Sequence, residues 1–252
     1  THFIAEWLRS ESKVTLITRP RRFGKTTLLS TVENFLDPRF GGHSEYFEKL
    51  QVWTEEDCRT LYGTIPVISV SFGSCKGRDY AQAIRGMISS FYNLYESHRY
   101  LMEGEKLDAE DKAVYQRMKK ALEMGDETKA ESAIPRLCRL LYRYYGIWPV
   151  ILLDEYDTPL LEAYTDGYWE EMIGTCRQLF HAAFKENAYY SRAIITGVTR
   201  VTKNSLFSDL NNIEVDTVTC DAYSDCFGFT EEEVIDALQC QNVYSLISTV
   251  LI

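Results

Sequence analysis

The sequence predicts an α/β fold with a mainly parallel sheet, and two observations carry this prediction. Short apolar runs of strand length recur along the chain, at 14–18 (VTLIT), 66–72 (PVISVSF), 149–153 (PVILL) and 192–197 (RAIITG). Segments rich in helix formers separate these runs, and their apolar residues repeat at helical spacing. Strands that alternate with helices are typical of a sheet whose strands run parallel.

The amino-terminal elements follow in a regular order. A short amphipathic helix is expected at 3–9, and the first strand is followed by a helix at 25–36 with one apolar stripe. This helix ends at Asp37 because a proline follows, and the residue before a proline disfavours helix. The run Thr-Glu-Glu-Asp at 54–57 predicts a capped helix start.

The central and carboxy-terminal elements continue the alternation. Residues 79–145 carry no strand signal and are rich in helix formers, so three helices are expected there, broken near Gly104 and Gly125. The continuous apolar run PVILL suggests a strand buried on both faces of a parallel sheet. A helix at about 167–187 and one more strand at 213–218 complete the pattern.

The composition excludes several classes of protein. The chain has 252 residues, of which 45% are apolar and 25% charged, as in an ordinary globular protein. Its net charge of -10 disfavours a protein that coats nucleic acid, and no apolar run is long enough to span a membrane. The seven cysteines form no C-x-x-C pair, so we expect free or buried thiols in a reducing compartment, the cytoplasm.

The most informative motif lies between the first strand and the helix at 25–36. It reads Arg19, Pro20, Arg21, Arg22, Phe23, Gly24, Lys25 and Thr26. The phosphate-binding pattern G-x-x-x-x-G-K-[ST] matches at Gly24, Lys25 and Thr26, whereas Arg19 replaces its first glycine. Without that glycine the first turn must use another backbone geometry. A chance G-K-T is the alternative, but the preceding strand and following amphipathic helix disfavour it.

The residue types of this loop suit a phosphorylated ligand. Backbone N–H groups at a helix start favour an anion, and Gly24 lets the backbone approach a phosphate closely. Lys25 would carry positive charge to the β- and γ-phosphates, and Thr26 would offer a hydroxyl to Mg²⁺. The three arginines of the loop add local positive charge to an acidic protein.

A second motif, Val-Ile-Leu-Leu-Asp-Glu at 150–155, ends a predicted buried strand with two acids. Asp154 would hold Mg²⁺, directly or through water, and Glu155 would orient the attacking water or accept its proton. Because neighbouring strand residues point to opposite faces, the two carboxylates can do different work. A solvated acidic turn is the alternative interpretation.

The strand at 192–197 supplies two further candidates. Thr196 could sense the γ-phosphate or position water, and Arg200 could reach a phosphate in its own chain or across an interface. The alternatives are an ordinary strand-end threonine and a solvated arginine. The expected nucleotide-contacting residues are Pro20, Arg21, Arg22, Phe23, Gly24, Lys25, Thr26, Thr27 and Thr196. Glu155, Lys25 and Arg200 are the expected catalytic residues, and Thr26 and Asp154 the expected metal ligands.

Taken together, the motifs resemble the predicted AAA-ATPase-like family of bacterial and archaeal proteins. The resemblance rests on four runs in the same order: ITRPRRFGKTTLLS, PVILLDEYDTPL, ITGVTRVTKNSLFSDLNN and YSDCFGFTEEEV. Members of this family share the arginine at the first loop position. The resemblance implies a three-layer P-loop NTPase of the additional-strand type, with a large helical insertion in its mainly parallel sheet. It further implies that Lys25 and Thr26 form Walker A, and that Asp154 and Glu155 form Walker B.

The resemblance also implies a strand order and a domain organisation. The strand with Thr196 should lie between the strands that carry the two motifs. Residues 1–218 are expected to form the ATPase core, with the insertion at about 79–145, and 219–252 the truncated start of a C-terminal helical segment. A capping box at 230–233 opens a helix in that segment. Family members often carry a C-terminal PD-(D/E)XK nuclease-like domain, but this chain shows no D…E-x-K constellation.

Three functions are compatible with these features. The first is Mg²⁺-dependent ATP hydrolysis that drives a conformational switch, with ATP preferred to GTP because of the resemblance. The second is a nucleotide sensor or scaffold that hydrolyses slowly and controls a partner or an attached effector domain. The third, a nucleic-acid-binding module, is disfavoured by the acidic balance. A homo-oligomer is compatible with the first two, since arginine fingers can act across subunits.

Overall fold

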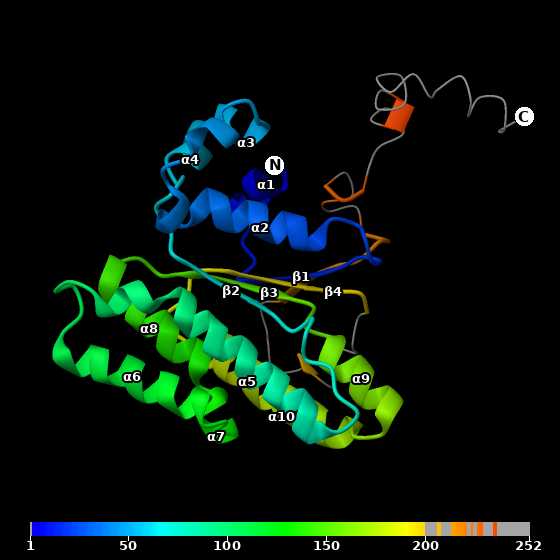
Figure 1. The fold of residues 1–252 in the computed structure, drawn as a ribbon. Coiled ribbons are helices and arrows are strands. Elements are labelled where there is room, and N and C mark those ends of the chain that lie inside the picture. The colour runs from blue at the N-terminus through cyan, green and yellow to red at the C-terminus, as the bar shows by residue number, and fades with distance from the viewer. Residues whose placement is uncertain are drawn as a thin grey trace, which may run out of the picture.

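A parallel sheet with strand order β2-β3-β4-β1-β5 forms the centre of the structure (Figure 1). The computed structural model describes residues 2–199, 206–207, 213–220, 223, 226–228 and 234–235. Every neighbouring pair of strands in this described part runs parallel, so the predicted α/β fold is confirmed. The strands are β1 (Val14–Thr18), β2 (Val67–Ser71), β3 (Val150–Asp154), β4 (Ala193–Gly197) and β5 (Ile213–Asp216).

Helices cover both faces of the sheet and give three layers, with α1–α4 on one face and α5–α10 on the other (Figure 1). They are α1 (His2–Arg9), α2 (Lys25–Leu36), α3 (Gln51–Thr54), α4 (Glu56–Arg59), α5 (Tyr80–Ser97), α6 (Ala109–Glu123), α7 (Glu127–Ala130), α8 (Ala133–Tyr145), α9 (Thr158–Asp166) and α10 (Trp169–Phe180). Short 3-10 turns lie at Pro38–Phe40, Ser44–Tyr46 and Arg99–Met102, and a π-helical turn, His181–Lys185, extends α10.

The three central strands are buried along their whole length, which explains their apolar sequences. All five residues of β1, of β3 and of β4 are buried, as expected for strands covered by helices on both faces. The strand order puts β4 between β1 and β3, in agreement with the predicted place of the Thr196 strand. In register, Thr18 lies opposite Gly197 and Ser71 opposite Asp154, so the strands end at one edge of the sheet.

Amphipathic helices close the two cores. The buried face of α2 consists mainly of Leu29, Val32, Phe35 and Leu36, close to the predicted stripe. On the other face, α5 and α8 pack against β2, and α6 packs against α5 and α8 (Figure 1). Burying each large apolar side chain contributes about 1.5–3 kcal/mol. These helices lie between β2 and β3, where the sequence predicts an insertion, and the domain boundaries stay a prediction.

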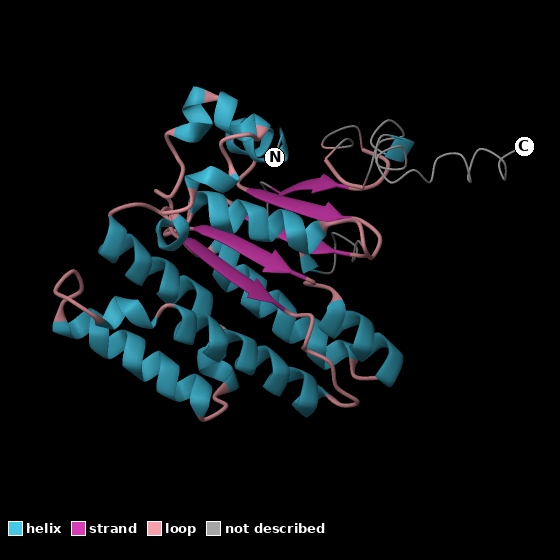
Figure 2. Cartoon of the chain, turned by 45° about the horizontal axis from the view of Figure 1, so that its top comes forward, coloured by secondary structure: helices cyan, strands magenta, loops and turns pink. Residues whose placement is uncertain are grey.

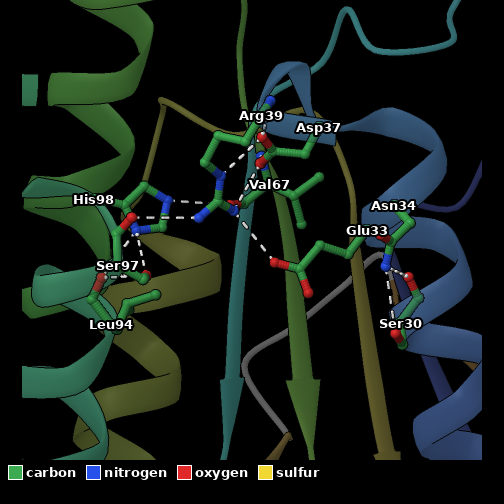
Figure 3. Close-up of polar contacts among 9 residues, drawn as sticks. All are labelled: Ser30, Glu33, Asn34, Asp37, Arg39, Val67, Leu94, Ser97 and His98. Atoms are coloured by element: carbon green, nitrogen blue, oxygen red, sulfur yellow. Dashed lines mark hydrogen bonds and ion pairs between the residues drawn. The ribbon is translucent and has the colours of Figure 1, made fainter. Parts of the chain in front are cut away.

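A buried polar cluster joins the two helical layers at the edge of the sheet where the strands begin (Figure 3). The Asp37 carboxylate, at the end of α2, accepts hydrogen bonds from Arg39 Nε (2.9 Å) and from the Val67 N–H (2.8 Å). His98, at the end of α5, lies 3.2 Å from the Val67 carbonyl oxygen and 2.9 Å from that of Leu94. Burial lowers the pKa of His98 to about 4, which identifies it as a neutral structural group.

Two local predictions were wrong or incomplete. Thr54 does not cap a helix start, because it ends α3 and its hydroxyl donates to the Gln51 carbonyl at 2.7 Å. Helix α9 was missed: Pro159 occupies its first turn, where proline needs no N–H partner. The helix expected at 230–233 lies outside the described residues.

The described cysteines fit the prediction of free thiols. Cys58, Cys75, Cys138 and Cys176 are buried, and Cys220 and Cys226 are half-buried. None of these six described cysteines forms a disulfide. Within the same part of the chain, no helix combines the length and apolar character needed to cross a membrane.

Candidate functional site

A cavity of about 490 Å³ lies at the edge of the sheet where the strands end. In an open parallel sheet this edge is where ligands bind. Figure 2 shows the parallel strands directed toward it. The cavity is lined by Arg21, Arg22, Gly24, Lys25, Thr26, Thr27, Lys76, Glu155, Asp157, Thr158, Leu161, Glu162 and Val198.

The β1–α2 loop, residues 19–24, is shaped by two left-handed residues. Arg22 has φ 69° and Gly24 has φ 78°, and Gly24 directly precedes the first residue of α2. Glycine adopts this conformation without steric cost, whereas an arginine in it is strained by about 1–3 kcal/mol. The first turn of a helix has backbone N–H groups with no intrahelical partner, and in α2 this turn lines the cavity, an arrangement that suits an anion.

Lys25 connects the two ends of this loop. Its ammonium donates to the carbonyl oxygens of Arg19 (2.9 Å) and Pro20 (2.8 Å). An ammonium has three N–H groups, so one donor is left for a ligand in the cavity. Burial lowers the pKa of Lys25, while the negative charges of Asp154, Asp157 and Glu155 oppose that shift. The Lys25 ammonium therefore lies between the carbonyl groups of the loop and a group of carboxylates.

The carboxylate of Asp154 joins residues from three separate elements. The Thr26 hydroxyl, on α2, donates to its Oδ2 at 2.6 Å, across 128 positions of sequence. The Thr196 hydroxyl, on β4, donates to its Oδ1, which also accepts the Glu155 N–H at 3.0 Å. A carboxylate and a hydroxyl are hard oxygen donors of the kind that Mg²⁺ prefers. The predicted metal ligands, Thr26 and Asp154, thus lie in contact and have suitable chemistry.

Glu155 points its carboxylate to different partners. The residue has φ 52°, and it directly follows the end of β3. The Thr158 hydroxyl donates to its Oε2 at 3.0 Å. A Cβ built on Gly73, in the segment after β2, would lie only 2.8 Å from the same oxygen, so a side chain at that position would displace the carboxylate. The two neighbouring acids therefore have separate surroundings, as the sequence suggested.

Asp157 is a buried residue of the site whose role the sequence did not reveal. Its Oδ2 accepts hydrogen bonds from the Val198 N–H (2.9 Å), the Thr199 N–H (2.7 Å) and the Thr199 hydroxyl (2.8 Å). The Tyr156 hydroxyl donates to the Thr199 carbonyl at 2.9 Å. These two residues fix the segment after β4 against the segment after β3. The sequence signal was a third acid just beyond the Asp154–Glu155 pair.

The loop residues expected to contact nucleotide do not all face the cavity. Pro20 and Phe23 are exposed and do not line it, although the Pro20 carbonyl accepts from Lys25. Arg21, Arg22 and Thr27 do line it. Arg200 lies outside the described residues.

The orientation of Arg19 differs from the prediction that all three loop arginines add positive charge for a ligand. Its guanidinium turns away from the cavity and pairs with Asp216 on β5 at 2.7 Å, so its charge is neutralised by a neighbour in the sheet. The left-handed residues of the loop are Arg22 and Gly24, so Arg19 needs no glycine-like backbone conformation. The loss of the first glycine is therefore accommodated without a left-handed conformation at that position.

Comparison with known proteins agrees with this geometry. The sequence profile of the family described as Predicted AAA-ATPase matches residues 1–207. The chain belongs to the predicted AAA-ATPase family. A relative from Azotobacter chroococcum mcd 1, described as an uncharacterized protein in the vnfD 5′ region, is 31% identical over 220 residues. The match covers 86% of this chain and 36% of the relative, so the chain spans about a third of that protein's length.

Membership of the predicted AAA-ATPase family indicates nucleotide binding and confirms the predicted resemblance. No solved structure matches the chain. The matched region, 1–207, includes the β1–α2 loop and the ends of β3 and β4. All the cavity residues described above therefore belong to the part of the chain that the predicted AAA-ATPase family shares.

Proposed function

We propose that this chain binds ATP together with Mg²⁺, hydrolyses it, and uses the cycle as a conformational switch. The observation that carries the proposal is the contact of Thr26 with Asp154, beside the Lys25 ammonium and one cavity. A cationic loop at a helix start and a carboxylate at a neighbouring strand end are what a nucleoside triphosphate with its metal requires. The family supports nucleotide binding, and the choice of ATP is part of the proposal.

Each residue has a defined task in this proposal. The loop N–H groups, Lys25 and the cavity arginines bind the phosphates, and Thr26 and Asp154 hold Mg²⁺, which would neutralise phosphate charge. Thr196 orients the Asp154 carboxylate through its hydroxyl. Glu155 accepts the proton of the attacking water. Arg200 is proposed to contact phosphate in its own chain or in a second subunit.

A slower nucleotide sensor is a second candidate, and one contact favours it. The Thr158 hydroxyl donates to Glu155 Oε2, so one oxygen of the proposed general base is already engaged within the chain. In that case nucleotide occupancy, rather than turnover, would control a second copy of the chain or an attached effector domain. Both candidates predict nucleotide binding, and they differ in phosphate release.

Equilibrium binding of ATP tests the proposal through Lys25. Titration with Mg²⁺–ATP should give saturable binding to the wild type, and Lys25→Ala should weaken it about tenfold or more, because a charged hydrogen bond contributes about 1.5–3 kcal/mol. Lys49→Ala, at an exposed lysine away from the cavity, is the matched control and should bind like the wild type. A wild type that fails to bind ATP, or an unaffected Lys25→Ala variant, would overturn the proposal.

A further inference from the structure

The ion pair between Arg19 and Asp216 joins the start of the β1–α2 loop to the end of β5, and neither residue lines the cavity. We propose that this pair holds the β1–α2 loop in the conformation that binds nucleotide. Through the pair, Arg19 fixes the start of the loop, where the general phosphate-binding pattern has a glycine. The inference rests on the proposed function, because it concerns the affinity of the same site. Arg19 acts here through the backbone of the loop, as a positioning residue.

The surroundings of the Arg19 guanidinium leave it little freedom. One terminal nitrogen pairs with Asp216 Oδ2 at 2.7 Å, and the other donates to the Thr18 carbonyl at 3.1 Å. The guanidinium also lies over the ring of Phe227, 4.8 Å from its centre. Only 4% of the Arg19 side chain and none of the Asp216 side chain is exposed. A planar guanidinium held by a carboxylate, a carbonyl and a ring has essentially one orientation.

The backbone of Arg19 transmits this fixed position to the site. Its carbonyl accepts the Lys25 ammonium at 2.9 Å, and its N–H donates to the Gly197 carbonyl, at the end of β4, at 3.2 Å. One residue thus connects β5 through its side chain, β4 through its N–H and the cavity lysine through its carbonyl. If the Arg19 side chain lost these contacts, the Arg19 carbonyl that accepts from Lys25 would no longer be fixed in position.

Asp216 depends on Arg19 in return. Its Oδ2 pairs with the guanidinium, whereas its Oδ1 is buried and has no hydrogen-bond partner within the described residues. A buried carboxylate with one satisfied oxygen is costly unless a cation stays beside it. Replacing Arg19 with glycine would leave this carboxylate unpaired, and it would also give the first loop residue more conformational freedom. Both effects act on the start of the loop.

The expected effect of Arg19→Gly is the opposite of what the general sequence pattern suggests. Arg19→Gly would bring the loop into agreement with the general phosphate-binding pattern, yet in this protein it should weaken binding. We expect the Kd for Mg²⁺–ATP to rise about tenfold in Arg19→Gly and in the same direction in Asp216→Asn. The double variant should bind no more weakly than Arg19→Gly alone, because both changes break one interaction. Arg19→Lys, which keeps the charge, should recover part of the affinity.

Titration of the full chain with Mg²⁺–ATP, below the melting temperature of every variant, is the test. Asp37→Asn is the matched control, since the buried Asp37 pairs with the half-buried Arg39 at the opposite edge of the sheet, and this variant should lose stability without losing affinity. If Arg19→Gly does not fold, Asp216→Asn and Arg19→Lys give the same comparison.

The possible outcomes separate this inference from the proposed function. If the wild type binds ATP and Lys25→Ala does not, but Arg19→Gly binds as tightly as the wild type or more tightly, the positioning role is wrong. An equal loss of affinity in Asp37→Asn would also overturn it, because general destabilisation would then explain the effect. If the wild type itself does not bind ATP, the proposed function fails and this inference falls with it.

Discussion

Asp154 is the residue on which the candidate site depends most. Its two oxygens accept hydrogen bonds from Thr26 on α2 and Thr196 on β4, so one carboxylate fixes the relative positions of three elements. The sequence predicted Thr26 from the G-K-T motif and Thr196 as a polar residue at the end of a strand. It did not predict that Asp157 anchors the segment after β4, because that role depends on which backbone N–H groups lie within reach.

Thr196→Val tests the role of the β4 hydroxyl. Valine has nearly the same shape but cannot donate, so Asp154 Oδ1 would keep only the Glu155 N–H as a partner and the carboxylate would be less firmly oriented. Phosphate release should fall about tenfold to a hundredfold, with a small change in melting temperature. Thr165→Val, at an exposed threonine on α9, is the control and should keep the wild-type rate. Equal rates in all three proteins would contradict the assignment.

Asp157→Ala tests the anchor between the segments after β3 and β4. The change removes the buried carboxylate that accepts three hydrogen bonds and leaves the Val198 and Thr199 N–H groups without that partner. We expect a loss of about 3 kcal/mol or more in the free energy of unfolding, measured by urea denaturation. A loss below about 1 kcal/mol would show that the segment after β4 does not need this carboxylate.

At the scale of elements, the strands were easier to predict than the helices between them. A strand buried on both faces must be apolar throughout, which is why β1, β3 and β4 were found within two residues of their bounds. The helices α3, α4 and α7 have only four residues each, too few for a periodic signal, and tertiary contacts decide their ends. Thr54 was misassigned for this reason.

The polar cluster at the start of β2 gives a prediction about pH. Burial lowers the pKa of His98 from 6.5 to about 4. Between these pH values His98 is protonated in the unfolded chain and neutral in the folded chain. Stability should therefore fall as the pH drops from about 6.5 to 4, by about 3.5 kcal/mol at about 1.4 kcal/mol per pH unit. Urea denaturation of the wild type and His98→Gln should show a shallower decline in the variant. Parallel pH profiles would contradict this explanation.

At the scale of the whole molecule, the charge distribution is uneven. The chain has a net charge of -10, yet one cavity is lined by four basic residues, Arg21, Arg22, Lys25 and Lys76, against three acidic ones, Glu155, Asp157 and Glu162, and so has a small excess of positive charge. Such a local field favours a polyanion and disfavours bulk binding of nucleic acid. The family resemblance was sufficient to predict that β4 lies between β1 and β3, and the sequence motifs predicted that two distant segments converge. The direction of the Arg19 side chain could not be predicted, because it depends on Asp216, far away in the sequence on an adjacent strand.

Glu155→Gln is the most direct test of the claim that one nucleotide is bound and hydrolysed at this cavity. Binding of Mg²⁺–ATP and release of phosphate should be measured on the same preparations of wild type, Glu155→Gln and the exposed control Glu105→Gln. The predicted result is a Kd within about threefold of the wild type and phosphate release reduced at least about a hundredfold, the size of a lost general base. Phosphate release by Glu155→Gln at the wild-type rate would contradict the claim.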